Sequence, residues 1–344
     1  MKQEKRMYNQ PFDLQLKYFR GRLIEEYLKT AFQAVNWMPC QIMARMHCDI
    51  KEDVPYHPDG EPHHLLDIYR PEKASARLPV LMYIHGGGFS ICSKDTHRPV
   101  GLAYADRGYL VFNVNYRLSP KHRFPAALED VSSAYQWIVE NAEQYGGDPD
   151  RIVIAGESAG ANLALALTIA CCYRRPEIMA QRVWDTGITP KAALILCGIL
   201  QVSNPDRFKN IMPVCRDMFP VCHYFKNTWN AIQLSIIHDI AASYIGIPYD
   251  NPPDGCELAD PLKVMESDIL PDRPLPAVFA MVGADDALLD DTNRLEAALK
   301  RQNAVHEVKY YPDEEHVFHL MCWKKEAERF WEDNWAFLKK YVGM

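Results

Sequence analysis

Short, almost continuously apolar runs recur between residues 78 and 283, and they constrain the fold more than any other feature of the sequence. A strand with one exposed face alternates apolar and polar residues, whereas a parallel strand with helices on both faces is apolar throughout. Helical stretches, notably 125–145 and 158–173, separate the runs. This alternation predicts βαβ units in an open sheet, with functional loops at the carboxyl ends of its strands. The runs cover residues 79–84, 109–116, 151–155, 191–198 and 276–283.

The ends of the chain add further elements to this α/β pattern. Apolar residues near helical spacing predict an amphipathic helix over 13–35. Residues 46–56 and 64–69 are extended segments on either side of Pro58-Asp59-Gly60, which indicates a hairpin. Residues 306–311 are expected to form a last strand and 325–341 a closing helix.

One segment, about 201–258, fits the alternation poorly, because it combines clustered aromatic residues and prolines with a single helical stretch at 228–244. An insertion at the active-site edge usually serves as a lid or specificity cap. The alternative is that its helices only extend the core. We expect N-terminal cap helices in 1–45, a catalytic domain formed by 46–200 and 259–344, and a cap insertion over 201–258.

Charge and cysteine usage exclude several classes of function. The chain has 344 residues and a formal net charge of -7 without a long basic run, which argues against a nucleic-acid partner and against an anionic membrane surface. Its ten cysteines include no Cys-x-x-Cys pair, so reduced thiols are expected rather than a structural zinc site. No apolar region follows the charged first residues, and the apolar stretch 161–172 is too short to span a bilayer. We expect a cytoplasmic protein without a membrane anchor.

Gly156-Glu157-Ser158-Ala159-Gly160 is the strongest local motif. It matches the Gly-x-Ser-x-Gly nucleophile elbow, in which a tight strand-to-helix turn exposes the serine and needs small residues on both sides. The context fits, because an apolar strand precedes the motif and an Ala/Leu-rich helix follows it. The alternative is an ordinary Gly-Ser turn, which does not need a strand before it and a helix after it. Ser158 is therefore the candidate nucleophile.

His85-Gly86-Gly87-Gly88 follows another predicted strand. Consecutive glycines allow backbone N–H groups to point at a substrate oxygen, as in the oxyanion hole of lipases and esterases. A phosphate-binding loop would need Gly-x-Gly-x-x-Gly or Gly-Lys-Ser/Thr, which this loop lacks. We expect Gly87 and Gly88, together with Ala159, to donate the N–H groups, and His85 to make local hydrogen bonds.

These motifs resemble those of the hormone-sensitive-lipase-like carboxylesterases, which include the bacterial family IV esterases. The resemblance covers residues 65–175 and 260–320, roughly half of the chain, and implies an α/β-hydrolase fold with a mostly parallel sheet, flanking helices and a small helical cap. Two positions depart from the usual pattern: Glu157 stands where many relatives have Asp or Thr, and Val317 where many have Gly. The matching motifs are His85-Gly86-Gly87-Gly88, Asn115-Tyr116-Arg117-Leu118-Ser119-Pro120, Phe124-Pro125-Ala126-Ala127 with Glu129-Asp130, Gly156-Glu157-Ser158-Ala159-Gly160, Asp286-Ala287-Leu288 and His316-Val317-Phe318.

Chain order assigns the two partners of the serine, because in this fold the acid and then the histidine follow it. His316 lies in a polar loop just after a predicted strand, whereas His319, one helical turn later, is expected to be structural. The acid should follow the strand 276–283, which leaves Asp285 and Asp286. The resemblance favours Asp286, which matches the family's Asp-x-Leu pattern. We therefore expect a Ser158–His316–Asp286 triad.

This triad predicts a serine hydrolase that cleaves carboxylic esters of small molecules, with short- to medium-chain acyl groups, and needs no metal and no cofactor. An amidase or deacetylase and a lactonase would use the same residues. A true interfacial lipase is a further alternative, although no large apolar lid face is evident. The plant gibberellin receptor resembles the family but binds a ligand and lacks the catalytic histidine, which this chain has. Relatives are often dimers, so the resemblance also allows a homodimer.

Overall fold

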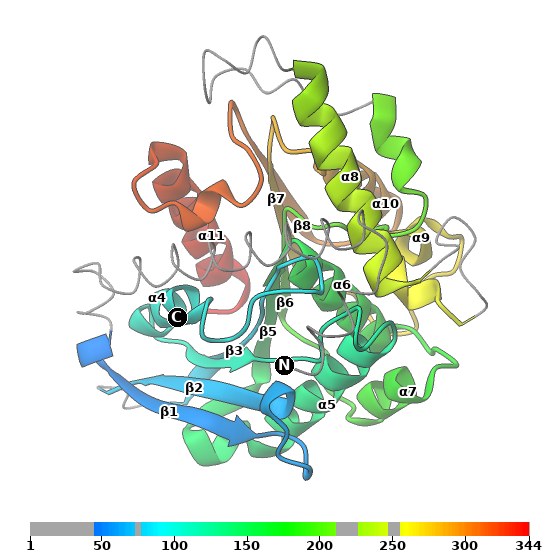
Figure 1. Ribbon diagram of the computed structural model, residues 1–344. Coiled ribbons are helices and arrows are strands. Elements are labelled where there is room, and N and C mark those ends of the chain that lie inside the picture. The colour runs from blue at the N-terminus through cyan, green and yellow to red at the C-terminus, as the bar shows by residue number, and fades with distance from the viewer. Residues whose placement is uncertain (1–44, 73–76, 211–225, 247–254, 344) are drawn as a thin grey trace, which may run out of the picture.

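The computed structural model describes residues 45–72, 77–210, 226–246 and 255–343 (Figure 1). Within these residues the chain forms an eight-stranded sheet in the order β1-β2-β4-β3-β5-β6-β7-β8. Strand β2 runs antiparallel to β1 and β4, and the other neighbouring strands are parallel. The strands are β1 (Cys48–Pro55), β2 (Leu65–Pro71), β3 (Leu78–Ile84), β4 (Leu110–Val114), β5 (Gly147–Glu157), β6 (Ala192–Leu196), β7 (Ala277–Gly283) and β8 (His306–Tyr311).

Helices cover both faces of this sheet. Helices α5, α6, α7, α9 and α10 contribute to the hydrophobic cluster on one face, and α4 and α11 to the cluster on the other. None of the helices in the described part of the chain combines the length and the apolar character needed to cross a membrane. The helices are α4 (Arg98–Asp106), α5 (Ala126–Asn141), α6 (Ala159–Cys172), α7 (Ile178–Asp185), α8 (Lys226–Tyr244), α9 (Pro261–Glu266), α10 (Leu289–Arg301) and α11 (Lys325–Tyr341).

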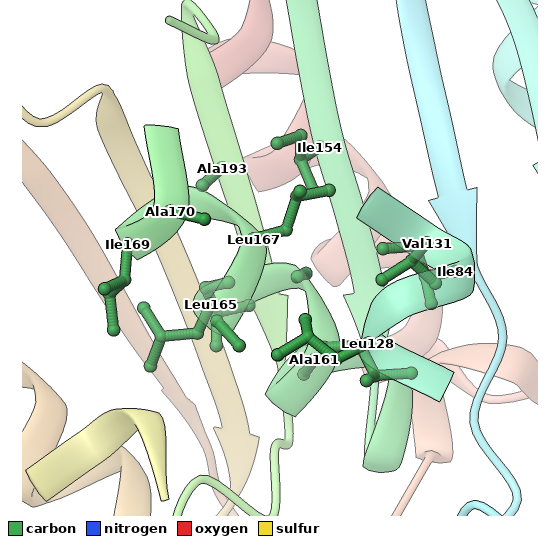
Figure 2. Packing of buried hydrophobic residues seen from close by; sticks show 14 of the residues in the cluster. Ile84, Leu128, Val131, Ile154, Ala161, Leu165, Leu167, Ile169, Ala170 and Ala193 are labelled. Carbon is green, nitrogen blue, oxygen red and sulfur yellow. The ribbon is translucent and has the colours of Figure 1, made fainter. Parts of the chain in front are cut away.

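The alternation of side chains along β3 explains why its sequence is apolar throughout. Val80 and Met82 belong to the cluster beneath α5 and α6, whereas Leu81 and Tyr83 belong to the cluster beneath α4 and α11. Figure 2 shows the first of these clusters, where side chains of α5 and α6 pack against residues of the strands. All 14 residues of α6 are buried, so this helix is enclosed by the sheet and its neighbours.

The predicted α/β architecture is confirmed, including the hairpin β1–β2, the last strand β8 and the closing helix α11. The pattern did not single out the short helices α4, α7 and α9. The predicted helix over 13–35 and much of the 201–258 insertion lie outside the described residues, whereas the stretch 228–244 falls within α8. Cys171, Cys172 and Cys197 are free and buried, as expected for thiols that serve as small apolar side chains.

The sheet places two loops beside each other at the carboxyl ends of neighbouring strands. Strand β3 has β4 on one side and β5 on the other, so the chain changes direction across the sheet at β3. Ligands of open α/β sheets bind in the crevice at the carboxyl ends of the strands around such a switch point. The loop after β3 begins with His85, and the turn after β5 carries Ser158. The fold therefore brings the glycine-rich loop next to the candidate nucleophile.

Candidate active site

The turn between β5 and α6 holds Ser158 in a conformation that is rare for residues with side chains, with φ 56° and ψ -118°. The flanking glycines are required by their surroundings. A Cβ atom at Gly156 would lie 2.4 Å from the carbonyl oxygen of Gly160, and one at Gly160 would lie 2.1 Å from the carbonyl oxygen of Ile84. The steric reason for the Gly-x-Ser-x-Gly pattern is therefore present in this chain.

Three side chains from three different loops form a continuous hydrogen-bonded chain. Ser158 Oγ lies 3.0 Å from His316 Nε2, and His316 Nδ1 lies 2.8 Å from Asp286 Oδ2. The Asp286 side chain is fully buried, whereas that of His316 remains partly exposed. The structure thus brings together all three residues that the sequence nominated, and the carboxylate beside His316 Nδ1 is that of Asp286. This geometry can transfer a proton from the serine hydroxyl to the imidazole.

The loops that carry the acid and the histidine are packed directly on one another. The backbone N–H of Asp285 donates to the carbonyl oxygen of Glu314 at 3.0 Å. At the end of β7, a Cβ atom on Gly283 would lie 2.0 Å from the same oxygen, so only glycine fits there. The other oxygen of Asp286, Oδ1, accepts the backbone N–H of Leu288 at 2.8 Å and fixes the carboxylate. Asp286 and His316 are therefore held at a set separation.

The environment of His316 tunes the basicity of its imidazole. Desolvation lowers the pKa of His316, but the nearby negative charge of Asp286 and the hydrogen bond from Nδ1 to its carboxylate raise it more. Glu157 adds a smaller contribution in the same direction. The pKa of His316 is consequently raised above its ordinary value, which favours acceptance of a proton.

The loop after β3 has the backbone freedom that the sequence suggested. Gly87 has φ 101° and Gly88 has φ 58°, and a Cβ atom on Gly87 would lie 2.3 Å from the carbonyl oxygen of Ile91. The N–H groups of Gly87, Gly88 and Ala159 do not donate to any other residue of the described ranges. Ala159 is also the first residue of α6, whose dipole is positive at this end. The three N–H groups are thus available to an external acceptor.

A buried carboxylate connects this loop to the nucleophile turn. Glu157 is fully buried, and its side chain accepts hydrogen bonds from the backbone N–H of Gly86 and from the Tyr83 hydroxyl. His97 Nε2 lies 2.8 Å from Glu157 Oε1. Burial raises the pKa of Glu157. The charge of His97 and the hydrogen bonds from His97 and Tyr83 lower this pKa by more, so the pKa lies below its ordinary value. Glu157 therefore anchors the glycine-rich loop as an ionised group.

His85 and Tyr116 also contact this loop. The two rings are stacked with centroids 4.3 Å apart, and the Tyr116 hydroxyl donates to the carbonyl oxygen of His85 at 2.8 Å. His85 is buried, and its Nδ1 lies 2.8 Å from the Gly86 carbonyl oxygen, in agreement with a local hydrogen-bonding role. Sequence reasoning did not identify His97, Tyr83 or Tyr116 as supports. Only Tyr116 lay in a motif that had been noted.

His319 lies behind the site rather than in it. Its side chain is buried among aromatic rings, and neither ring nitrogen has a hydrogen-bond partner. Desolvation lowers the pKa of His319 to about 3, so the imidazole is neutral. This environment agrees with the expected structural role of His319.

Two groups of side chains in the described ranges have the composition of a metal site: Cys197–Asp286–His316 and His57–Asp59–His64. The first overlaps the candidate triad. Burial raises the pKa of the Cys197 thiol well above its ordinary value, and a protonated thiol is a poor metal ligand. Both ring nitrogens of His316 belong to the hydrogen-bonded chain that joins Asp286 to Ser158. The first group therefore suits proton transfer and not metal binding.

Helix α8 lies over the glycine-rich loop. Ser243 Oγ is 3.0 Å from Ser90 Oγ, and the Tyr244 ring stacks on Phe89 with centroids 3.6 Å apart. The side chain of Ile240 is so close to Gly88 that a Cβ atom there would lie 3.0 Å from it. The described part of the 201–258 segment is thus in contact with the loop that carries the candidate oxyanion donors.

The chain is similar in sequence to known hydrolases and esterases. The family model of the alpha/beta hydrolase fold matches residues 81–320. Over 119 residues, 34% of this chain, the sequence is 41% identical to "Carboxylesterase NlhH" of Mycobacterium tuberculosis, but the match spans only 37% of that relative. A longer match, to "Esterase LipU" of the same species, is 30% identical over 257 residues and covers 72% of this chain and 75% of the relative.

Solved structures show the same fold along nearly the whole chain. "Bacterial Heroin Esterase" has a TM-score of 0.69 at 24% identity and covers 92% of each chain. An esterase from the bacterial hormone-sensitive lipase family has a TM-score of 0.67 at 24% identity, over 93% of this chain and 91% of that one. At such identities the likeness establishes the fold alone.

Proposed function

Because the chain belongs to the α/β-hydrolase family and its motifs resemble those of the hormone-sensitive-lipase-like carboxylesterases, we propose that it hydrolyses carboxylic esters through an acyl-enzyme on Ser158. The observation that carries the proposal is the hydrogen-bonded chain from Ser158 Oγ through His316 to the buried Asp286 carboxylate. Its substrates are small-molecule esters with short- to medium-chain acyl groups.

The proposed reaction has two halves. His316 Nε2 accepts the hydroxyl proton of Ser158 while Oγ attacks the ester carbonyl, and the protonated imidazole then donates that proton to the departing alcohol. In the second half, water loses its proton to His316 and attacks the acyl-enzyme, which releases the acid and restores Ser158. Asp286 keeps the hydrogen of the neutral imidazole on Nδ1, so that Nε2 faces the serine as an acceptor.

The N–H groups of Gly87, Gly88 and Ala159 are proposed to stabilise the negative oxygen formed in each half. Their support is that they make no internal hydrogen bond in the described chain, and that Ala159 lies at the positive end of α6. Removal of a single donor of this kind typically slows an enzyme by about 10²–10³-fold. Because all three donors are backbone groups, their directions depend on how rigidly the backbone of the glycine-rich loop and of the nucleophile turn is held.

The decisive experiment is hydrolysis of p-nitrophenyl esters of increasing acyl length, with a matched set of amides and lactones. We expect turnover of the short esters, and Ser158→Ala should reduce it by about 10⁴-fold or more with an unchanged fold. A phosphonate or sulfonyl fluoride should label Ser158 in the wild-type protein. Labelling of Ser90 or Ser119 instead would refute the assignment of the nucleophile. Faster turnover of the amides or lactones would reassign the leaving group.

We also propose that the 201–258 segment and the N-terminal 1–45 region act as a cap over a catalytic domain made of 46–200 and 259–344. The support is the contact of α8 with the glycine-rich loop through Ile240, Ser243 and Tyr244. A helix in this place limits the space above the oxyanion donors. Ile240→Ala should therefore raise the relative rate on longer acyl chains. Val264→Ala, a similar truncation within α9 in the core, is the control and should leave the preference unchanged.

A further inference from the structure

The turn between β1 and β2 carries three potential metal ligands that the proposed hydrolysis does not use. His57 and Asp59 precede a short 3-10 turn, Pro62–His64, which ends at the buried His64. One ligand atom from each of these three side chains lies within 4.8 Å of the other two. The segment, drawn in blue in Figure 1, lies beside the N-terminal part of α5, because His64 contacts Asp130 there.

The separations between ligand atoms are close to those that a zinc ion needs. His64 Nδ1 lies 2.8 Å from Asp59 Oδ1, and His57 Nδ1 lies 3.2 Å from the same oxygen. Tetrahedral bonds of about 2.0–2.1 Å place neighbouring ligand atoms roughly 3.3 Å apart. Two imidazoles and one carboxylate form a common donor set for zinc that leaves a fourth position open.

The surroundings of His64 suit a cation that is bound by both His64 and Asp59. His64 Nε2 lies 3.1 Å from Asp130 Oδ1, and Nδ1 faces both oxygens of Asp59 at 2.8 Å. A neutral imidazole has one N–H, so it can donate to only one of the two carboxylates. If that donor is Nε2, the lone pair of Nδ1 points at Asp59, and a metal ion bound to both side chains makes ligands of two acceptors that otherwise face each other.

Asp130 has the features of an outer-shell carboxylate. Histidine ligands usually donate their other ring N–H to a carboxylate, which fixes the tautomer and orients the ring. Asp130 is almost fully buried and is held by Arg117, whose Nε donates to it at 2.9 Å and whose backbone N–H donates at 2.7 Å. The His64 ring is thereby fixed with Nδ1 toward Asp59.

The cluster is also accessible. The side chains of His57 and Asp59 are 44% and 38% exposed, which provides an entry path for an ion. They border a cavity of about 660 Å³ that is also lined by Arg117, Glu129 and Arg182 and that includes no residue of the candidate triad. The open coordination position would face water or a small anionic ligand.

We propose that His57, Asp59 and His64 bind one Zn²⁺ ion, with Asp130 as the outer-shell carboxylate and water in the fourth position. The ion joins the β1–β2 turn to α5 and takes no part in acyl transfer. Its loss therefore lowers the thermal midpoint of unfolding without changing the rate of ester hydrolysis.

The test uses the full chain after removal of metal by a chelator. Equilibrium dialysis against Zn²⁺ should give one bound ion per chain, and the thermal midpoint should rise with added Zn²⁺. His57→Ala, a change at a half-exposed side chain, should weaken binding by more than about 100-fold, and Asp130→Asn by about 10–100-fold. The control is His47→Ala, because His47 is an exposed histidine 4.0 Å from a single carboxylate of Asp106; it should bind Zn²⁺ like the wild type.

Substitution of Co²⁺ for Zn²⁺ in the wild-type protein provides a measurement that does not depend on the variants. Nitrogen and oxygen ligands give d–d bands without the sulfur-to-metal charge-transfer band that a cysteine ligand adds. The proposal is overturned if the wild type binds no Zn²⁺, if His57→Ala binds it as tightly as the wild type, or if the Co²⁺ spectrum shows thiolate ligation.

Discussion

Replacement of Asp286 by asparagine tests how the acid controls the tautomer of His316. Asp286 uses Oδ1 to accept the backbone N–H of Leu288 at 2.8 Å and Oδ2 to contact His316 Nδ1 at 2.8 Å. An asparagine has one acceptor, and the N–H of Leu288 claims it, so the amide nitrogen must face His316. Since that nitrogen donates, Nδ1 becomes the acceptor and the hydrogen moves to Nε2.

This tautomer points an N–H at Ser158 Oγ, 3.0 Å away, and cannot accept the serine proton. The loss in kcat should be about 10⁴-fold, or roughly 5 kcal/mol of transition-state stabilisation at 1.36 kcal/mol per factor of ten. The fold should be unchanged, because the two side chains are nearly the same size. Single-ester kinetics from pH 5 to 9, with circular dichroism of each variant, provide the measurement.

The pH profile gives a second readout of the same change. Neutral His316 is the active base, so kcat/KM falls as the pH drops through its pKa. Desolvation lowers that pKa, but Asp286 raises it more, and without the carboxylate the acidic limb should move to lower pH. Asp285→Asn is the matched control, with a far smaller loss and an unmoved limb. A larger loss at Asp285, or an Asp286→Asn variant that keeps a tenth of the wild-type kcat, would refute the assignment.

Three further predictions concern metal, acid stability and the cap. EDTA should leave the rate of p-nitrophenyl ester hydrolysis unchanged; inactivation that added zinc reverses would contradict a metal-free reaction. Burial lowers the pKa of His319 to about 3, well below its unfolded value of 6.5, so the unfolded chain binds a proton that the folded chain rejects. The contribution of His319 to the free energy of unfolding should therefore be largest above pH 6.5 and fall by up to roughly 5 kcal/mol toward pH 3; urea titrations should show a shallower fall in His319→Phe, and equal slopes would contradict this. Smaller side chains at Phe219, Phe225 or Trp229, whose side chains lie outside the described part of the structure, should shift the preferred acyl length more than the stability, and an unchanged preference in all three would remove the cap from substrate selection.

The sheet could be predicted because its strands are buried on both faces. Such strands carry a continuous apolar run that needs no knowledge of their partners, as β7 (Ala277–Gly283) illustrates with every residue buried. Helices α4 and α9 are nine and six residues long, too short for an apolar periodicity to emerge from the surrounding loops. Chain order and loop position indicated Ser158 and His316 and left two carboxylates, and the family's Asp-x-Leu pattern favoured Asp286 over Asp285.

The supports of the site depend on contacts that no local pattern records. His97 and Glu157 are 60 positions apart and meet only after β3 and β5 pair, so neither position predicts the other. The same holds for His64 and Asp130, which are 66 positions apart and belong to no common motif. In both cases a buried carboxylate, that of Glu157 or Asp130, is paired with a histidine that is distant in the sequence. The free-energy cost of leaving such a carboxylate unpaired can be judged only once its burial is known.

The position of Glu157 also restricts how this site can change during evolution. One carboxylate holds the Gly86 N–H, the Tyr83 hydroxyl and His97 while its own backbone precedes the nucleophile. An aspartate here would fall short by about 1.5 Å, one carbon–carbon bond, and would release at least one of the three donors. We therefore expect a relative with Asp at position 157 to differ from this chain at position 83 or 97 as well. In an alignment of relatives, these positions should vary together.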